Sequence, residues 1–96
     1  MVVPTTPYQR GAGFERRVKD YYAKKGCCVG RVAGSRGVFD LMVVCDGTPI
    51  GIQCRADGRL SVEQAGRMKT EALRCGMKAV LVYRGKNREL VFKEIL

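Results

Sequence analysis

The stretch from Phe39 to Arg55 constrains the fold more than any other part of the chain. It contains two apolar runs, residues 39–45 and 50–55, which are joined by Asp46-Gly47-Thr48-Pro49. The joining segment is rich in the residue types that form turns. Apolar runs of this length between turn signals are typical of strands that are buried on both faces. We therefore predict two strands, paired as a hairpin, in a sheet that is covered on both sides.

Three polar residues lie at the ends of these runs. Asp40 is near the start of the first run, and Gln53 and Arg55 are near the end of the second. Gln53 and Arg55 are two residues apart, so their side chains point to the same face of a strand. Pairing as a hairpin would bring all three polar groups to one end of the sheet. A buried carboxylate needs a partner, and for Asp40 this is either a salt bridge to Arg55 or a role in a functional site.

The remaining pattern predicts two helices and three further strands in a single domain. Residues 1–11 read as an N-terminal arm of this domain, which spans residues 1–96. The helices are expected over 12–25 and 62–75, the second with a capping box formed by Ser61 and Gln64. The other strands are expected over 27–33, 78–83 and 89–95. The order is α-β-β-β-α-β-β, in which the second helix crosses over so that the fourth strand can lie parallel to a central one.

Each predicted helix has an apolar stripe at helical spacing. In the first helix the stripe consists of Phe14, Val18, Tyr21 and Tyr22, and in the second it consists of Val62, Ala65, Met68, Ala72 and Leu73. Glu15 is expected in the first turn of its helix, where the positive end of the helix dipole is a sufficient reason for a carboxylate. The alternative is that Glu15 faces the same end of the sheet as Asp40.

Charge favours a polyanionic partner. The 96 residues include 18 basic and 9 acidic side chains, for a formal charge of +9. This bias indicates nucleic acid first and an acidic membrane surface second. A basic protein without such a partner is the remaining alternative.

The five cysteines indicate free thiols. Their number is odd, no C-x-x-C occurs and the chain has no histidine, so a structural zinc site is not expected. Free thiols are typical of a reducing compartment. There is also no apolar run of the roughly 20 residues needed to span a membrane, and the first residues do not read as a signal peptide. These features together predict a cytoplasmic protein.

Glu15, Asp40 and Gln53 would offer two carboxylates and one amide oxygen to a common site. Such hard oxygen ligands suit Mg²⁺ or Mn²⁺. A basic residue beside them, here Arg55, could hold a scissile phosphate or its attacking water. This combination of groups is typical of a metal-dependent phosphodiesterase.

The pattern resembles the PD-(D/E)xK nuclease superfamily and is most similar to the archaeal-type Holliday junction resolvases, which also occur in phages. The similarity runs from Gly11 to about Phe92. It is carried by Gly13-Phe14-Glu15-Arg16, Val32-Ala33-Gly34-Ser35, Val38-Phe39-Asp40-Leu41, Ile52-Gln53-Cys54-Arg55 and Leu60-Ser61-Val62-Glu63-Gln64. The resemblance implies an α/β, restriction-endonuclease-like fold with a mixed five-stranded sheet flanked by helices.

The resemblance also implies an activity and its parts. The chain would be a homodimeric endonuclease that cuts four-way junctions in branched double-stranded DNA with Mg²⁺, for which Mn²⁺ can substitute. It would act in the cytoplasm, which is the host's if the protein comes from a phage. Glu15, Asp40 and Gln53 would be the metal ligands and Arg55 the residue on the phosphate side. The resemblance adds Ser35, in the loop beside the site, and Gln64, at the start of the second helix, as candidate DNA contacts. On charge alone, the candidates for phosphate contacts are Arg10, Arg16, Arg17, Arg31 and Arg36.

Two departures from the family pattern bear on catalysis. The family has Glu-x-Lys where this chain has Gln53-Cys54-Arg55, and Phe39 replaces a common proline. Glutamine keeps an oxygen ligand but loses its charge, and arginine is effectively never deprotonated, so it cannot act as a general base. Asp57 either restores the missing charge or is a turn aspartate.

Because of these departures, the chain could be a nuclease or a branched-DNA-binding module without cleavage. A single-strand binder is less well supported, because most of the few aromatic residues fit the core.

Overall fold

A computed structural model describes residues 7–31 and 38–95, with the side chains of residues 7–12 and of Arg31 left out. The elements are α1 (Pro7–Lys24), β1 (Cys28–Arg31), β2 (Leu41–Cys45), β3 (Thr48–Cys54), α2 (Val62–Cys75), β4 (Lys78–Arg84) and β5 (Leu90–Glu94). The first residues of the expected arm and the end of the first expected strand lie outside this description. No helix in the described ranges is long and apolar enough to cross a membrane.

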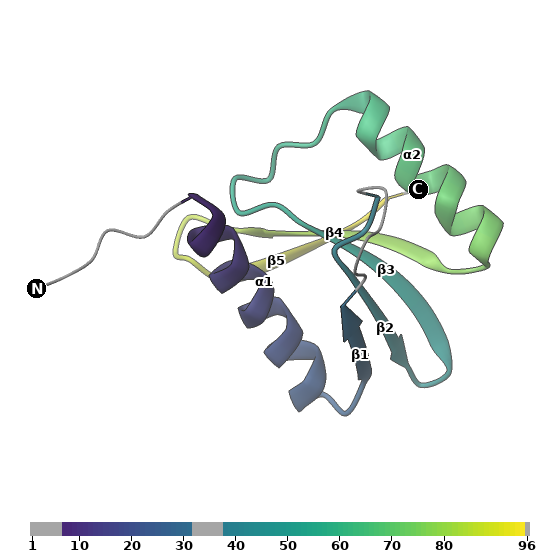
Figure 1. Ribbon diagram of the computed structural model, residues 1–96, viewed down its shortest axis with the longest axis horizontal. Coiled ribbons are helices and arrows are strands. Elements are labelled where there is room, and N and C mark those ends of the chain that lie inside the picture. Colours follow the sequence, from purple (N-terminus) through teal and green to yellow (C-terminus); the bar gives the residue numbers. More distant parts are fainter. Residues whose placement is uncertain (1–6, 32–37, 96) are drawn as a thin grey trace, which may run out of the picture.

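The five strands form one mixed sheet in the order β1-β2-β3-β4-β5. All neighbours are antiparallel except β3 and β4, which run parallel and are connected through α2. The two helices cover opposite faces of the sheet (Figure 1). The predicted element order, the central hairpin and the parallel fourth strand are therefore confirmed.

The hairpin between β2 and β3 is tighter than expected. Cys45 pairs with Thr48, so the turn consists of Asp46 and Gly47 alone and Pro49 belongs to β3. Both turn residues have positive φ, 51° for Asp46 and 79° for Gly47. Two such residues match the twist of the flanking strands, which is why Asp-Gly is a preferred hairpin turn.

Helix α1 begins at Pro7, five residues before its expected start at residue 12. Proline is well tolerated in the first helical turn because the N–H groups there have no partner within the helix. The earlier start changes the position of Glu15, which lies in the middle of the helix rather than in its first turn. Its presence is therefore not explained by the helix dipole.

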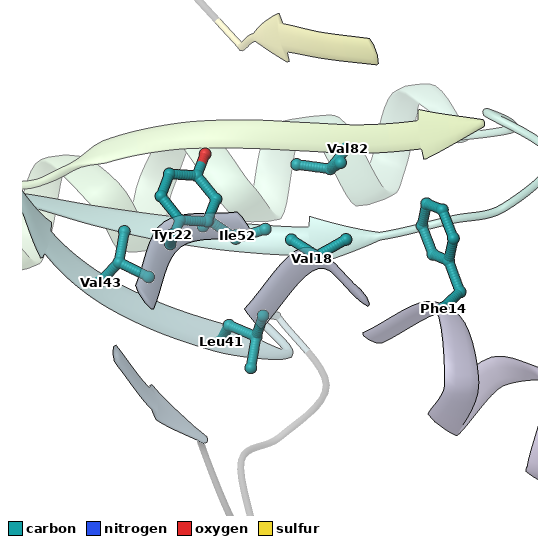
Figure 2. Close-up of a cluster of buried hydrophobic side chains, with 7 residues drawn as sticks. All are labelled: Phe14, Val18, Tyr22, Leu41, Val43, Ile52 and Val82. Carbon is teal, nitrogen blue, oxygen red and sulfur yellow. The ribbon is translucent and has the colours of Figure 1, made fainter. Parts of the chain in front are cut away.

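The larger core lies between α1 and the sheet. Phe14, Val18 and Tyr22 of α1 are buried, as the apolar stripe predicts, whereas Tyr21 is only partly buried. Figure 2 shows the buried cluster that they form with strand residues Leu41, Val43, Ile52 and Val82. Full burial of such a side chain stabilises the fold by about 1.5–3 kcal/mol, so this cluster fixes α1 on the sheet.

The smaller core lies under α2 and contains Met68, Ala72, Phe39 and Ala79. The prediction that Val62 and Leu73 of α2 face the core is wrong. Val62 is 91% exposed and Leu73 is 84% exposed. They are apolar in type but lie on the outer side of the helix, since only positions near Met68 and Ala72 meet the sheet.

The expectation of free thiols is wrong for two of the five cysteines. Cys27 and Cys45 form a disulfide with a Cα–Cα distance of 4.6 Å. The antiparallel register pairs Cys28 with Val44, which places Cys27 directly opposite Cys45 and within the usual range for a disulfide. Cys28, Cys54 and Cys75 are free thiols.

Gly51 should be intolerant of any side chain. A Cβ atom at this position would lie 2.7 Å from the ring of Phe39, which is 4% exposed and cannot move aside. We expect Gly51→Ala to lower the free energy of unfolding by about 1–3 kcal/mol, the usual cost of overpacking a core. Urea denaturation would measure this loss.

Gly66→Ala is the matched control. Gly66 lies within α2, and a Cβ atom there would meet nothing within 4 Å. The same substitution should stabilise the protein by roughly 0.5–1 kcal/mol, because alanine favours the helix. Equal effects at the two glycines would contradict the packing described here.

Candidate active site

Strand β2 departs from β3 at Asp40. The Asp40 N–H donates to the carbonyl oxygen of Ile52 at 2.8 Å, which is the last backbone bond between these two strands in the described part of the chain. The next donor along β3, the N–H of Cys54, is taken by the Asp40 side chain, with 2.8 Å between Cys54 N and Asp40 Oδ2. The carboxylate thus replaces a missing strand partner and is fixed at the opening between the strands.

Glu15 reaches the same region from α1. It is half-buried and follows Phe14, whose side chain anchors the helix on the sheet. Both carboxylates act on the Cys54 thiol, which lies on the α1 side of β3. Burial raises the pKa of this thiol, and the negative charges of Asp40 and Glu15 raise it further. Asp40 and Glu15 thus lie near enough to Cys54 for both charges to act on its thiol.

Gln53 and Arg55 lie on the other side of β3, the face that α2 covers. Gln53 is only 6% exposed. With its amide oriented to suit its neighbours, its nitrogen donates to the carbonyl oxygen of Val38 at 2.7 Å, and its oxygen accepts from Arg55 Nε at 3.2 Å. The side chain expected to bind a cation is therefore engaged with the arginine.

Two alternatives for the nearby carboxylates can be compared with these contacts. An Asp40–Arg55 salt bridge is not among the ion pairs of the described residues, and Asp40 instead accepts from Cys54 N–H. Asp57 accepts a hydrogen bond from the N–H of Arg59 at 3.0 Å. This short contact within the turn is the role of a turn aspartate.

A small hollow opens beside Gln53 and Arg55, between β3 and α2. Gln64, a predicted DNA contact, lines it, and so does Arg67, which sequence reasoning missed. Arg67 lies three residues after Gln64 on the same helix, so helical spacing places both on one side. That spacing was a usable signal once Gln64 had been singled out.

The other predicted DNA contacts lie away from this hollow or outside the residues that the structure describes. Arg16 and Arg17 are exposed on α1 and line a shallow groove toward β5 together with Lys24. Arg10 and Arg31 lie in α1 and β1, but their side chains are outside the described residues. Ser35 and Arg36 lie outside them altogether.

The donor groups present are compatible with a hard divalent cation. Asp40 and Glu15 provide carboxylate oxygens, and Gln53 can add an amide oxygen. Among the residues described, however, no three acidic, cysteine or histidine side chains gather as a metal-binding group. The third ligand would have to be neutral, which weakens the affinity for a cation.

Comparison with known proteins places this geometry in a family. The chain matches the model of the family described as Archaeal holliday junction resolvase (hjc) over residues 6–95. It is also similar to Hjc of Archaeoglobus fulgidus, a Holliday junction resolvase from an archaeal hyperthermophile, with a TM-score of 0.77 and 22% identity. That match covers 90% of this chain and 73% of the other. No curated protein matches the chain.

The Cys54 thiol offers a test of this geometry that needs neither metal nor DNA. In a protein with Cys28 and Cys75 changed to serine, we expect Asp40→Asn and Glu15→Gln each to speed alkylation of Cys54 by iodoacetamide. Removing a negative charge lowers the pKa of the thiol, so more thiolate is present at a given alkaline pH.

The measurement is the alkylation rate as a function of pH. Both substitutions should shift the profile of Cys54 toward lower pH. A profile unchanged by either substitution would mean that the carboxylates do not face this thiol. Asp20→Asn, an exposed site on the same helix as Glu15, is a control that should leave the profile in place.

Proposed function

The chain belongs to the archaeal Holliday junction resolvase family, whose activity is the cleavage of branched DNA, and we propose that it resolves four-way junctions with the help of a divalent cation. The observation that supports this most is the position of Asp40. Its carboxylate is fixed by the N–H of Cys54 where β2 and β3 separate, and the charge of Glu15 acts on the thiol of the same Cys54. Such a pair at the open end of a sheet is suited to holding Mg²⁺, or Mn²⁺ in its place.

When bound, the cation would supply Lewis-acid chemistry at the scissile phosphate. Asp40 and Glu15 are the proposed charged ligands, and the amide oxygen of Gln53 is the proposed neutral one. This oxygen accepts from Arg55 Nε, so we expect it to exchange the arginine for the cation. Gln53 must give up this hydrogen bond to bind the cation, and it lacks the charge of a glutamate. Both effects predict that half-maximal cleavage needs more Mg²⁺ than it would with a glutamate at position 53.

Arg55 is proposed to act on the phosphate and not on a proton. Its guanidinium stays charged at all relevant pH values, so it cannot take a proton from water. It can donate two hydrogen bonds to phosphate oxygens and stabilise the charge that develops during cleavage. The proton of the attacking water must therefore pass to another acceptor, such as solvent or the phosphate itself.

We also propose that the chain works as a homodimer in the cytoplasm. A four-way junction offers two strands for symmetric cleavage, and a two-fold dimer presents two identical sites to them. Light scattering should give a mass of two chains at micromolar concentration, and a mass of one chain would contradict the dimer. Cell fractionation would check the compartment.

Asp40→Asn should abolish cleavage of a four-way junction while leaving binding intact or stronger. The asparagine oxygen can still accept from Cys54 N–H, so the fold should persist. Loss of the charge removes the cation and also a repulsion against phosphate. Cleavage is read on a denaturing gel with Mg²⁺, Mn²⁺ or EDTA, and binding by gel shift in EDTA.

Asp46→Asn is the matched control at the other end of β2. Asp46 lies in the hairpin turn with positive φ, a conformation that asparagine also adopts, so this variant should cut as the wild type does. Undiminished cutting by Asp40→Asn would overturn the site. If even the wild type makes no cation-dependent cut, the chain is a binding module on a nuclease fold.

A further inference from the structure

We propose that the hollow beside Gln53 holds a backbone phosphate of the DNA, with Arg67 as a second arginine beside Arg55. This site would bind a phosphate next to the one that is cut. It shares Arg55 with the proposed catalytic site, whereas Arg67 has no role in that site. The proposal rests on the proposed function, since it assumes that branched DNA is the substrate.

The size of the hollow limits what can enter it. It measures about 40 Å³ and lies between the end of β3 and the first turns of α2. A single water molecule needs roughly 10–15 Å³ of such space. The hollow therefore has room for a few oxygen atoms, such as those of a phosphate.

The acceptors around the hollow are already in use. The oxygen of Gln53 accepts from Arg55 Nε. The side-chain oxygen of Gln64 accepts from the N–H of Ser61 at 3.2 Å, as part of the capping box of α2. Glu63, the acidic neighbour on the helix, accepts from one Nη of Arg67 at 3.0 Å.

What these contacts leave for a ligand is a set of donors. Arg55 keeps its two terminal guanidinium nitrogens, and Gln64 keeps its amide nitrogen. Arg67 keeps its second terminal nitrogen. The other lining residues, Val38, Leu60 and Met68, are apolar. Two positive charges and several donor groups without a partner in this set favour an anion, and phosphate oxygens fit the hollow by size and charge.

The ordering of these groups also suits a strand of DNA. Gln53 lies opposite Asp40 when the register of β2 and β3 is extended by one pair. Arg55 lies two residues after Gln53, and it lines the hollow together with Arg67. A strand whose scissile phosphate lies at Asp40 would pass its neighbouring phosphate over the hollow. The pair of Glu63 and Arg67 is largely exposed, at 76% and 63%, and such a surface pair is weak enough for a phosphate to compete.

The test measures the affinity of the full chain for a synthetic four-way junction in EDTA, where no cutting occurs. Arg67→Ala should weaken binding roughly tenfold or more, as expected for loss of a charged hydrogen bond. It should also reduce the slope of log affinity against log salt by about 0.9. Lys69→Ala removes the same charge from the far side of the same helix and should have a clearly smaller effect. Arg67→Lys should recover part of the loss in affinity. Lysine keeps the positive charge but lacks the planar guanidinium that donates two parallel hydrogen bonds.

Neutral methylphosphonates, placed at one position of the junction at a time, locate the contact. At one position near the branch point, the modification should lower the affinity of the wild type. With that modified junction, Arg67→Ala should lower the affinity no further. The proposal is overturned if Arg67→Ala behaves like Lys69→Ala, or if the two losses add at every position. Circular dichroism would verify that the variants are folded. Absence of Mg²⁺-dependent cutting by the wild type would refute the proposed function alone, because the binding comparison does not depend on cutting.

Discussion

The hydrogen bond between the Asp40 carboxylate and the N–H of Cys54 is the contact on which the site depends. It forms where β2 leaves the sheet and the backbone of β3 would otherwise lack a partner. An unpaired buried N–H is costly, so the same bond that completes the sheet also fixes the carboxylate. Stability and the proposed function thus depend on the same side chain in the same place. Phe39, the residue before Asp40, packs closely on Gly51. This packing limits where the Asp40 carboxylate can lie.

The change from the family's Glu-x-Lys to Gln53-Cys54-Arg55 acts as a coupled pair. The Gln53 oxygen accepts from Arg55 Nε, so the arginine is oriented by the residue that lost its charge. A glutamate here would keep the cation more tightly, and a lysine could be deprotonated when buried. This chain keeps neither property. What remains is an arginine whose guanidinium keeps its charge, which suits binding and charge stabilisation more than proton transfer.

Local features of the fold could be predicted from the sequence, whereas features set by tertiary contacts could not. The capping box of Ser61 and Gln64 depends only on neighbouring residues, and it forms as expected. The start of α1 was missed because prolines, threonines and glycines near residue 7 favour a loop when read alone. Val62 and Leu73 were assigned to the core by type and spacing, but which side of α2 packs on the sheet decides their exposure.

In the candidate site, too, features set by local spacing could be predicted and features set by tertiary contacts could not. Asp40, Gln53 and Arg55 could be placed at one end of the sheet because strand spacing fixes their faces. The engagement of Gln53 with Arg55 could not be predicted, because it depends on the carbonyl of Val38. The disulfide required the register between β1 and β2. Helical spacing places Arg67 on the side of Gln64, but its position beside Arg55 required knowledge that α2 lies over the end of β3.

The most direct test of the account is the binding of Mn²⁺ to the protein without DNA, followed by electron paramagnetic resonance. The wild type should bind Mn²⁺ weakly at a site that Asp40→Asn removes. Gln53→Glu should bind it more tightly, because it restores the third charge. Binding by Asp40→Asn that equals the wild type would contradict the central claim that this carboxylate holds the cation.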